Sequence, residues 1–85
     1  MKLLFTDVAW EDYQWWLAND KRVIKRVNLL LEDVKRNGHN GIGKPEALKH
    51  SLAGYWSRRI TGEHRLVYAI ENEIITVISC RYHYN

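Results

Sequence analysis

The sequence predicts a single α+β domain, spanning residues 1–85, in which two helices pack on one face of an antiparallel sheet. Three observations predict this fold class. Apolar residues recur at helical spacing through the first half of the chain, aromatic and β-branched runs separated by short turns fill the second half, and a glycine-rich segment joins the two halves. The predicted order of elements is β-α-α-β-β-β.

The first half of the chain predicts a short strand and then two helices. Residues 2–6 form a short apolar run that suits a strand. The first helix is indicated by apolar residues at helical spacing, which are Val8, Trp10, Tyr13, Trp16 and Leu17. A more regular apolar stripe marks the second helix and consists of Val23, Ile24, Val27, Leu30, Leu31 and Val34. Thr6 or Asp7 and then Asp20 are the expected N-caps, and Gly38 suits the position after the second helix.

The second half predicts three strands joined by short turns. The strand runs are 55–60, 65–70 and 74–80. Because the turns between them are short, the strands should form an antiparallel meander. Between the helices and these strands, residues 37–46 hold three of the five glycines and the only proline. Long loops of this kind are often functional.

Strand alternation assigns side chains to the two faces of the predicted sheet. In the middle run, the expected core face comprises His64, Leu66, Tyr68 and Ile70, and the opposite face comprises Arg65, Val67 and Ala69. In the last run, the residues expected to share a face are Val77, Ser79, Arg81 and His83. If Arg65 points to the open face, Arg59, Arg81 and His83 can gather near it, although a register shift of one residue would reverse this arrangement.

Charge and composition indicate an anionic partner. The net charge is +3 and the pI is about 9.2. A basic patch is expected in the second half, from Lys44, Lys49, Arg58, Arg59 and Arg65. Among the tryptophans, Trp10 and Trp16 are expected in the core, whereas Trp15 lies off the apolar stripe and suits a protein interface.

The cysteine and histidine content indicates the compartment and the cofactors. The single cysteine, Cys80, lies in an apolar run and is expected to be a buried side chain in a reducing compartment. No leader peptide or membrane span is recognisable, so a cytoplasmic location without membrane attachment is expected. The four histidines lack paired metal-ligand spacing, so neither a metal nor another cofactor is expected.

Three residues have the chemistry needed for metal-free RNA cleavage. Such cleavage needs a base for the 2′-hydroxyl, an acid for the leaving 5′-oxygen and a cation for the phosphorane. Glu46, His83 and Arg65 are the right residue types. Residue type alone leaves open the alternative that each is an ordinary solvated side chain.

Four segments resemble a known family. They are residues 44–50 (KPEALKH), 52–60 (LAGYWSRRI), 63–68 (EHRLVY) and 80–84 (CRYHY). Together they resemble the YoeB/Txe-type toxins of the RelE-like superfamily of bacterial toxin–antitoxin systems, and the resemblance runs along the full chain. It implies a fold like that of microbial ribonucleases and an endoribonuclease that cuts mRNA in the A site of the 70S ribosome and so inhibits translation.

The resemblance also implies roles for individual residues. Glu46 corresponds to the general base, Arg65 to the cation that stabilises the phosphate, His83 to the general acid and Tyr84 to a residue that shapes the site. The residues that correspond to the basic RNA-binding lining are Lys49, Arg59 and Arg81. Two departures from the family pattern concern the site: Asn85 follows the usual terminal His-Tyr pair, and Ala47 stands where a second proline is common.

The resemblance further implies partners. A cognate antitoxin of the YefM/Axe type would cover the toxin, partly by folding a disordered acidic segment onto it. A homodimer is suggested, and operator DNA would be bound only through the antitoxin complex. Ribosomal RNA and ribosomal proteins would surround the bound mRNA.

Two other functions stay open on the sequence. One is a non-catalytic RNA- or ribosome-binding module that blocks translation by occupancy. The other is a DNA-binding regulator with a helix-turn-helix in residues 7–36, although the apolar stripe of the second helix is better explained by core packing. The pattern G-x-x-x-x-G-K at residues 38–44 follows a helix and lacks the next Ser or Thr, so it does not indicate a nucleotide-binding loop.

Overall fold

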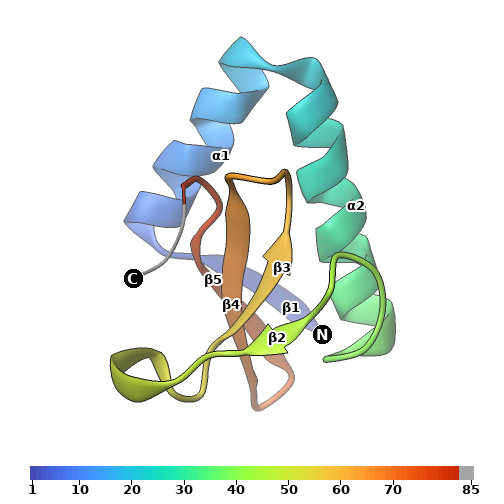
Figure 1. Ribbon diagram of the computed structural model, residues 1–85, viewed down its shortest axis with the longest axis vertical. Coiled ribbons are helices and arrows are strands. Elements are labelled where there is room, and N and C mark those ends of the chain that lie inside the picture. Colours follow the sequence, from blue (N-terminus) through green and yellow to red (C-terminus); the bar gives the residue numbers. More distant parts are fainter. Residues whose placement is uncertain (83–85) are drawn as a thin grey trace.

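The computed structural model describes residues 1–82 and confirms the α+β class. Within these residues two helices, α1 (Asp7–Asn19) and α2 (Lys21–Asn37), accompany five strands. The strands are β1 (Lys2–Phe5), β2 (Glu46–Ala47), β3 (Trp56–Arg59), β4 (Arg65–Glu71) and β5 (Ile74–Ser79), and a short 3-10 helix, η1 (His50–Leu52), lies between β2 and β3. Figure 1 shows the helices meeting at a tight turn and the segment between β2 and β3 projecting away from them. No helix in the described part of the chain is long and apolar enough to cross a membrane.

Local capping and an apolar stripe explain the two helices. The Thr6 hydroxyl accepts a hydrogen bond from the Ala9 backbone N–H at 3.1 Å, and the Asp20 carboxylate accepts from the N–H groups of Arg22 and Val23. Gly38 follows α2 with a φ of 63°, a conformation that glycine adopts without strain. The predicted stripe of α2 is buried at Ile24, Val27, Leu30, Leu31 and Val34.

α1 buries less apolar surface than the sequence predicts. Its buried residues are Ala9 and Trp16, seven positions apart on one line of the helix. The exposed apolar residues of α1 are Val8, Trp10, Trp15 and Leu17. The expectation that Trp10 lies in the core is therefore wrong, since this side chain is 51% exposed. Trp10 stacks on Tyr13 and contacts Phe5 of β1 edge-on. Because β1 is the edge strand, no further strand covers the outer side of Trp10.

The sheet is mixed rather than wholly antiparallel. Its strand order is β1-β5-β4-β3-β2. The predicted antiparallel meander of β3, β4 and β5 is confirmed, and β2 extends it, but β1 runs parallel to β5. Because two helices and three strands separate β1 from β5 in the chain, no tight turn imposes antiparallel pairing on them. β2, a strand of only two residues at the end of the long loop, was not expected from the sequence.

The two faces of β4 follow the predicted alternation. Leu66 and Tyr68 are fully buried in the cluster that packs against the helices, whereas Arg65 belongs to the opposite face. β5 departs from the prediction, because Val77 pairs with Tyr68 and Ser79 pairs with Val67. This register shift places Val77 and Ser79 on opposite faces, so the expectation that they share one is wrong.

Cys80 is fully buried, as predicted, and burial raises the pKa of its thiol to about 12, with the nearby Asp12 carboxylate acting in the same direction. Since the thiolate is the reactive form, the folded protein is expected not to react with a thiol reagent such as DTNB at pH 8. The measurement is the absorbance of released thionitrobenzoate. The guanidinium-unfolded protein, which exposes Cys80, is the control and should release one equivalent; rapid release from the folded protein would contradict the prediction.

Candidate active site

The strand register gathers three of the predicted site residues on one face. Glu46 of β2 pairs with Ser57 of β3, and two positions further along β3, Arg59 pairs with Arg65 of β4. Paired residues share a face, and so do residues two apart. Glu46, Arg59 and Arg65 therefore lie on the face opposite the helix-packed core. Given strands about 4.8 Å apart and about 3.3 Å per residue, the Cα atoms of Glu46 and Arg65 are roughly 12 Å apart, close enough for their side chains to approach one phosphate from two sides.

The Arg65 guanidinium is held by the turn before it. Its Nη1 donates to the backbone carbonyl oxygens of Thr61 at 2.9 Å, His64 at 3.1 Å and Gly62 at 3.3 Å. Among the described residues these bonds use Nη1 alone, which leaves Nε and Nη2 to face an anion. Arg59 is exposed, and its backbone N–H donates to the Gly43 carbonyl at 2.7 Å, which ties β3 to the loop before β2.

The C-terminal segment arrives at the same place. The backbone N–H of Arg65 donates to the carbonyl oxygen of Tyr82 at 3.1 Å, and the N–H of Tyr82 donates to Nδ1 of His64 at 2.6 Å. The last described residue is thus fixed at the start of β4. The predicted acid His83 and the site residue Tyr84 follow it in the chain and lie outside the described residues.

The remaining predicted RNA-binding residues are placed differently. Lys49 is exposed just before η1. Arg81 follows the end of β5, so the expectation that it shares a strand face with Val77 is wrong. Its guanidinium lies 3.6 Å from the ring centre of Trp15 and 4.8 Å from that of Tyr82. The exposed Trp15 is therefore partly covered by Arg81.

Arg58 does not belong to the predicted basic patch. It is fully buried on the helix side of β3, and all five of its N–H donors are used. The acceptors are the Asp33 carboxylate, the Tyr68 hydroxyl and the backbone carbonyls of Gly38, Asn40 and Ile42. Strand alternation explains the difference from Arg59, because neighbouring residues of β3 face opposite sides.

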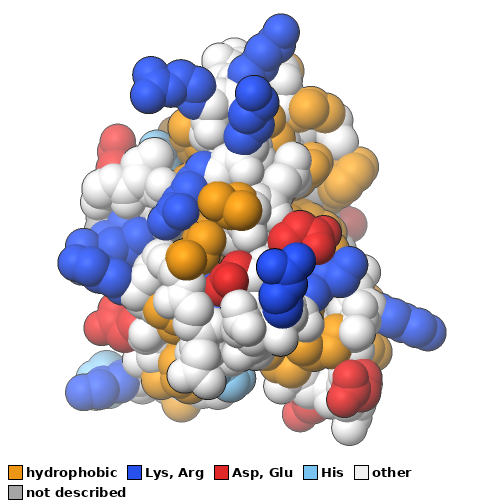
Figure 2. Space-filling model, turned by 90° about the vertical axis from the view of Figure 1, so that its right-hand side faces the viewer, with side chains coloured by type: hydrophobic (Ala, Val, Ile, Leu, Met, Phe, Trp, Pro, Cys, Tyr) orange, Lys and Arg blue, Asp and Glu red, His pale blue; other side chains and the backbone are white. Residues whose placement is uncertain are grey.

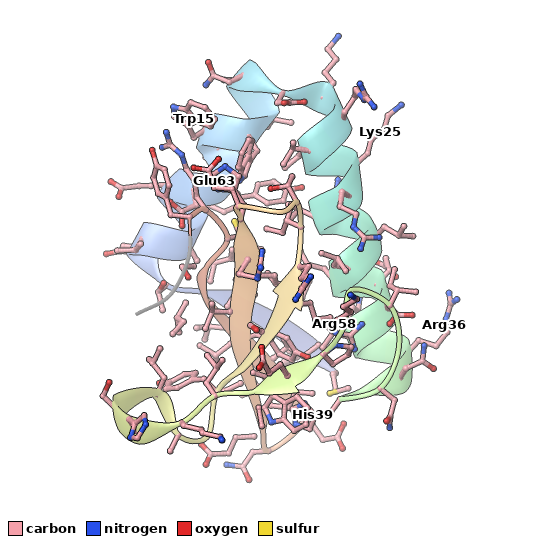
Figure 3. The ribbon with its side chains drawn as sticks, viewed as in Figure 1. Trp15, Lys25, Arg36, His39, Arg58 and Glu63 are labelled. Carbon is pink, nitrogen blue, oxygen red and sulfur yellow. The ribbon has the colours of Figure 1, made fainter. Side chains whose placement is uncertain are left out.

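Arg58 fixes the loop that leads to Glu46. In Figure 3 its side chain lies between β3 and the loop that follows α2. The hydrogen bond from Arg58 holds the pKa of the Asp33 carboxyl below its usual range. Gly41, with a φ of 130°, passes so close that a Cβ there would collide with the Asp33 carboxylate. The network thus fixes the chain at residues 38–42, a few residues before β2.

Positive charge also lies outside the predicted patch, along α2. Figure 2, which views the side of the molecule where α2 lies, shows Lys and Arg side chains along this surface. The basic residues of α2 are Lys21, Arg22, Lys25, Arg26, Lys35 and Arg36. In residues 1–82 no group of three or more His, Cys, Asp or Glu side chains is placed to hold a metal ion.

The residues that hold the C-terminal segment could not be identified from the sequence. The N–H of Cys80 donates to the Asp12 carboxylate at 3.0 Å, and the carbonyl oxygen of Cys80 accepts from the Trp16 indole at 2.7 Å. His64, expected only as a core residue, keeps 14% of its side-chain surface exposed and accepts from Tyr82. No spacing in the sequence relates α1 to residues 80–82, so no local signal could have shown these contacts.

Glu46, Arg59 and Arg65 thus share one sheet face, and the C-terminal segment is bonded to β4 at Arg65. The arrangement suits proton transfer beside a bound phosphate. A toxin from Helicobacter pylori, 17% identical to this chain, superimposes with a TM-score of 0.84 over 98% of this chain and 94% of that one, and so shares its fold. The chain belongs to the YoeB-like toxins of bacterial type II toxin–antitoxin systems, because the profile of that family matches residues 5–84.

Relatives across the whole length support this assignment. Toxin YoeB from Synechocystis is 55% identical over 99% of this chain and 98% of that protein, and Toxin YoeB from Escherichia coli is 51% identical over 99% and 100%. The YoeB/ParE toxin structure from Agrobacterium tumefaciens has a TM-score of 0.96 at 48% identity over 99% of this chain and 100% of that one. The YoeB–YefM heterotetramer from Staphylococcus aureus contains a chain with a TM-score of 0.92 at 49% identity, over 99% and 98%.

Proposed function

We propose that this protein is a ribosome-dependent endoribonuclease that cuts mRNA in the A site and thereby stops translation. The observation that carries the proposal is the placement of Glu46, Arg59 and Arg65 on one sheet face, at the point where the C-terminal segment joins β4. Membership of a toxin family supports it. A carboxylate weakens the binding of RNA phosphates but can act as a base, so its place on the same face as two guanidinium groups favours catalysis over the non-catalytic alternative.

The proposed reaction is an internal transesterification without a metal. The Glu46 carboxylate removes the proton from the 2′-hydroxyl, and the 2′-oxygen attacks the adjacent phosphorus. Arg65, with Arg59 beside it, stabilises the negative charge that grows on the phosphorane oxygens. The His83 imidazolium donates its proton to the leaving 5′-oxygen, so that the products are a 2′,3′-cyclic phosphate and a 5′-hydroxyl. Tyr84 shapes the site.

The proposed partners follow from the relatives and from the charge of the surface. Solved structures of Staphylococcus aureus YoeB include a YoeB–YefM complex and a YoeB dimer. We propose a YefM-like antitoxin for this chain as well, with a homodimer as the form free of antitoxin, and operator binding only through the complex. Lys49, Arg59 and Arg81 would contact phosphates of the bound RNA, and a cytoplasmic location follows from a ribosomal substrate.

The test is to add the purified protein to a translating extract and to map mRNA 5′ ends by primer extension. New ends at A-site codons are expected with the wild type and not with His83→Ala. The same mRNA without ribosomes shows whether cleavage depends on them. Inhibited translation with intact mRNA would refute the nuclease and support blocking by occupancy, and operator binding by this chain alone would support the regulator.

A further inference from the structure

We propose that the exposed rings of Trp15 and Tyr82, with the Arg81 guanidinium packed on both, form a stacking surface for an unpaired base of the bound RNA. The inference rests on the proposed function, because it adds a base contact beside the phosphate that Arg65 is proposed to bind. It assigns a binding role to two aromatic residues that neither the proposed reaction nor the basic lining uses.

The first step is the contact between three planar groups. The Arg81 guanidinium lies 3.6 Å from the ring centre of Trp15 and 4.8 Å from that of Tyr82. Both rings stay accessible, since Trp15 is 39% exposed and Tyr82 is 55% exposed. Exposed aromatic rings bind single-stranded RNA because every base has a π face that can stack on them. A guanidinium that stacks through its face keeps its N–H edges for a phosphate, so the cluster suits a nucleotide as a whole.

The second step is that the protein itself fixes this cluster. Cys80 is held by two side chains of α1, which bond its N–H and its carbonyl. The N–H of Tyr82 donates to His64 Nδ1 at 2.6 Å, and its carbonyl accepts from the Arg65 N–H at 3.1 Å. The φ of Tyr82 is 64°, a left-handed conformation that non-glycine residues seldom adopt without such support. Both neighbours of Arg81 are therefore held in place, and a surface that needs little ordering loses less entropy on binding.

The third step is the continuity of the cluster with the candidate site. The bond from the Arg65 N–H places the backbone of Tyr82 against the first residue of β4. Figure 3 shows Trp15 at the same end of the molecule as Glu63, in the turn between β3 and β4. Trp10, the other exposed tryptophan of α1, packs beside the edge strand β1 instead. A phosphate at Arg65 and a base on the rings can thus belong to neighbouring nucleotides of one strand.

The test is fluorescence anisotropy of 5′-labelled 2′-O-methyl RNA hexanucleotides, which lack the 2′-hydroxyl and cannot be cut. Tyr82→Leu and Trp15→Leu are each expected to weaken binding about tenfold, the usual effect of removing a stacked ring. The matched control is Trp10→Leu, which should bind like the wild type, and Tyr82→Phe should bind far better than Tyr82→Leu because it keeps the ring. No binding by the wild type at millimolar protein, or unchanged binding by both Tyr82→Leu and Trp15→Leu, would overturn the proposal.

A second readout uses the wild type itself. In a series of hexanucleotides that each lack one base, one abasic position should weaken binding about tenfold, and Tyr82→Leu should abolish this difference. The salt dependence separates stacking from phosphate binding: the slope of log Kd against log salt should be the same in Tyr82→Leu as in the wild type, whereas Arg59→Met should lower it by about 0.7. Equal binding of all abasic RNAs by the wild type would overturn the proposal even if the leucine variants misfold.

A contact between two copies of the chain is the competing use of the rings. If sedimentation equilibrium shows a wild-type dimer and a monomeric Tyr82→Leu with unchanged RNA affinity, the rings belong to that contact and the proposal is overturned. Failure of the proposed nuclease is distinguishable from this result. Hexanucleotide binding with the expected losses, but without new mRNA ends on ribosomes, would remove the reaction and leave the stacking surface.

Discussion

Replacing Glu46 by Gln is expected to lower the rate of mRNA cleavage on ribosomes by about 10²-fold or more. The substitution keeps the size of the side chain and the backbone pairing of residue 46 with Ser57. It removes the carboxylate, and an amide cannot accept the 2′-hydroxyl proton. The measurement is the single-turnover rate of appearance of new mRNA 5′ ends at saturating toxin, which separates the chemical step from ribosome binding.

The matched control is Glu71→Gln. Glu71 is exposed and shares the sheet face of Arg65, but it stands at the other end of β4, about 20 Å away at about 3.3 Å per residue. Its rate should equal that of the wild type. A Glu46→Gln variant that is folded and cuts as fast as Glu71→Gln would remove Glu46 from the mechanism.

Combining substitutions tests whether the three groups act in one step. Arg65→Ala and His83→Ala are each expected to lose about 10²-fold or more. If they serve the same transition state as Glu46, a double variant such as Glu46→Gln with His83→Ala should lose far less than the product of the two single losses. Losses that multiply fully would mean that Glu46 and His83 act independently of each other.

The second large effect is on stability: replacing Arg58 by Met is expected to reduce the free energy of unfolding by about 3 kcal/mol or more. Met fills part of the volume but removes the donor to the Tyr68 hydroxyl and to three loop carbonyls, and it leaves the Asp33 carboxylate with only its bonds from Ile42 and Asn37. The measurement is urea denaturation followed by tryptophan fluorescence. Because the loop at residues 38–42 loses its anchor, amide protection there should fall more than in β4.

The neighbouring residue provides the control. Arg59→Met changes the same residue type one position along β3 on the exposed face, and the free energy of unfolding should change by less than about 0.5 kcal/mol. RNA affinity, by contrast, should fall in Arg59→Met, since this guanidinium is proposed to contact phosphate. Equal losses of unfolding free energy in the two variants would contradict the assignment of Arg58 as buried and Arg59 as exposed.

The loss of stability in Arg58→Met is expected to depend on pH in one direction. Arg58 lowers the pKa of Asp33 below its ordinary value of 3.8 in the folded state. A group with a depressed folded pKa contributes stability above its unfolded pKa and loses that contribution as the pH falls through the folded pKa. The stability difference between wild type and Arg58→Met should therefore be full at neutral pH and shrink below about pH 4. A difference that grows on acidification would contradict the pairing.

The parts of the fold that depend on neighbours in the chain could be predicted from the sequence. α2 is the clearest case, because its apolar stripe, its Asp20 cap and the glycine after it are all local signals. The alternation of Leu66 and Arg65 in β4 is local in the same way. For the candidate site, residue chemistry and family motifs indicated Glu46 and Arg65 as candidates. Strand alternation allowed Arg59 to lie near Arg65, and the register pairs the two.

The tertiary structure decided everything that depends on which distant segments pair. Arg58 and Arg59 are adjacent and chemically identical in the sequence, yet one is fully buried on Asp33 and the other is exposed, because only the position of β3 in the sheet determines which face the helices cover. The parallel direction of β1, the register shift that separates Val77 from Ser79, and the bond from Tyr82 to His64 have the same origin. Helical and strand periods are properties of a few consecutive residues, whereas strand pairing and side-chain burial depend on contacts between residues tens of positions apart, which no local spacing encodes.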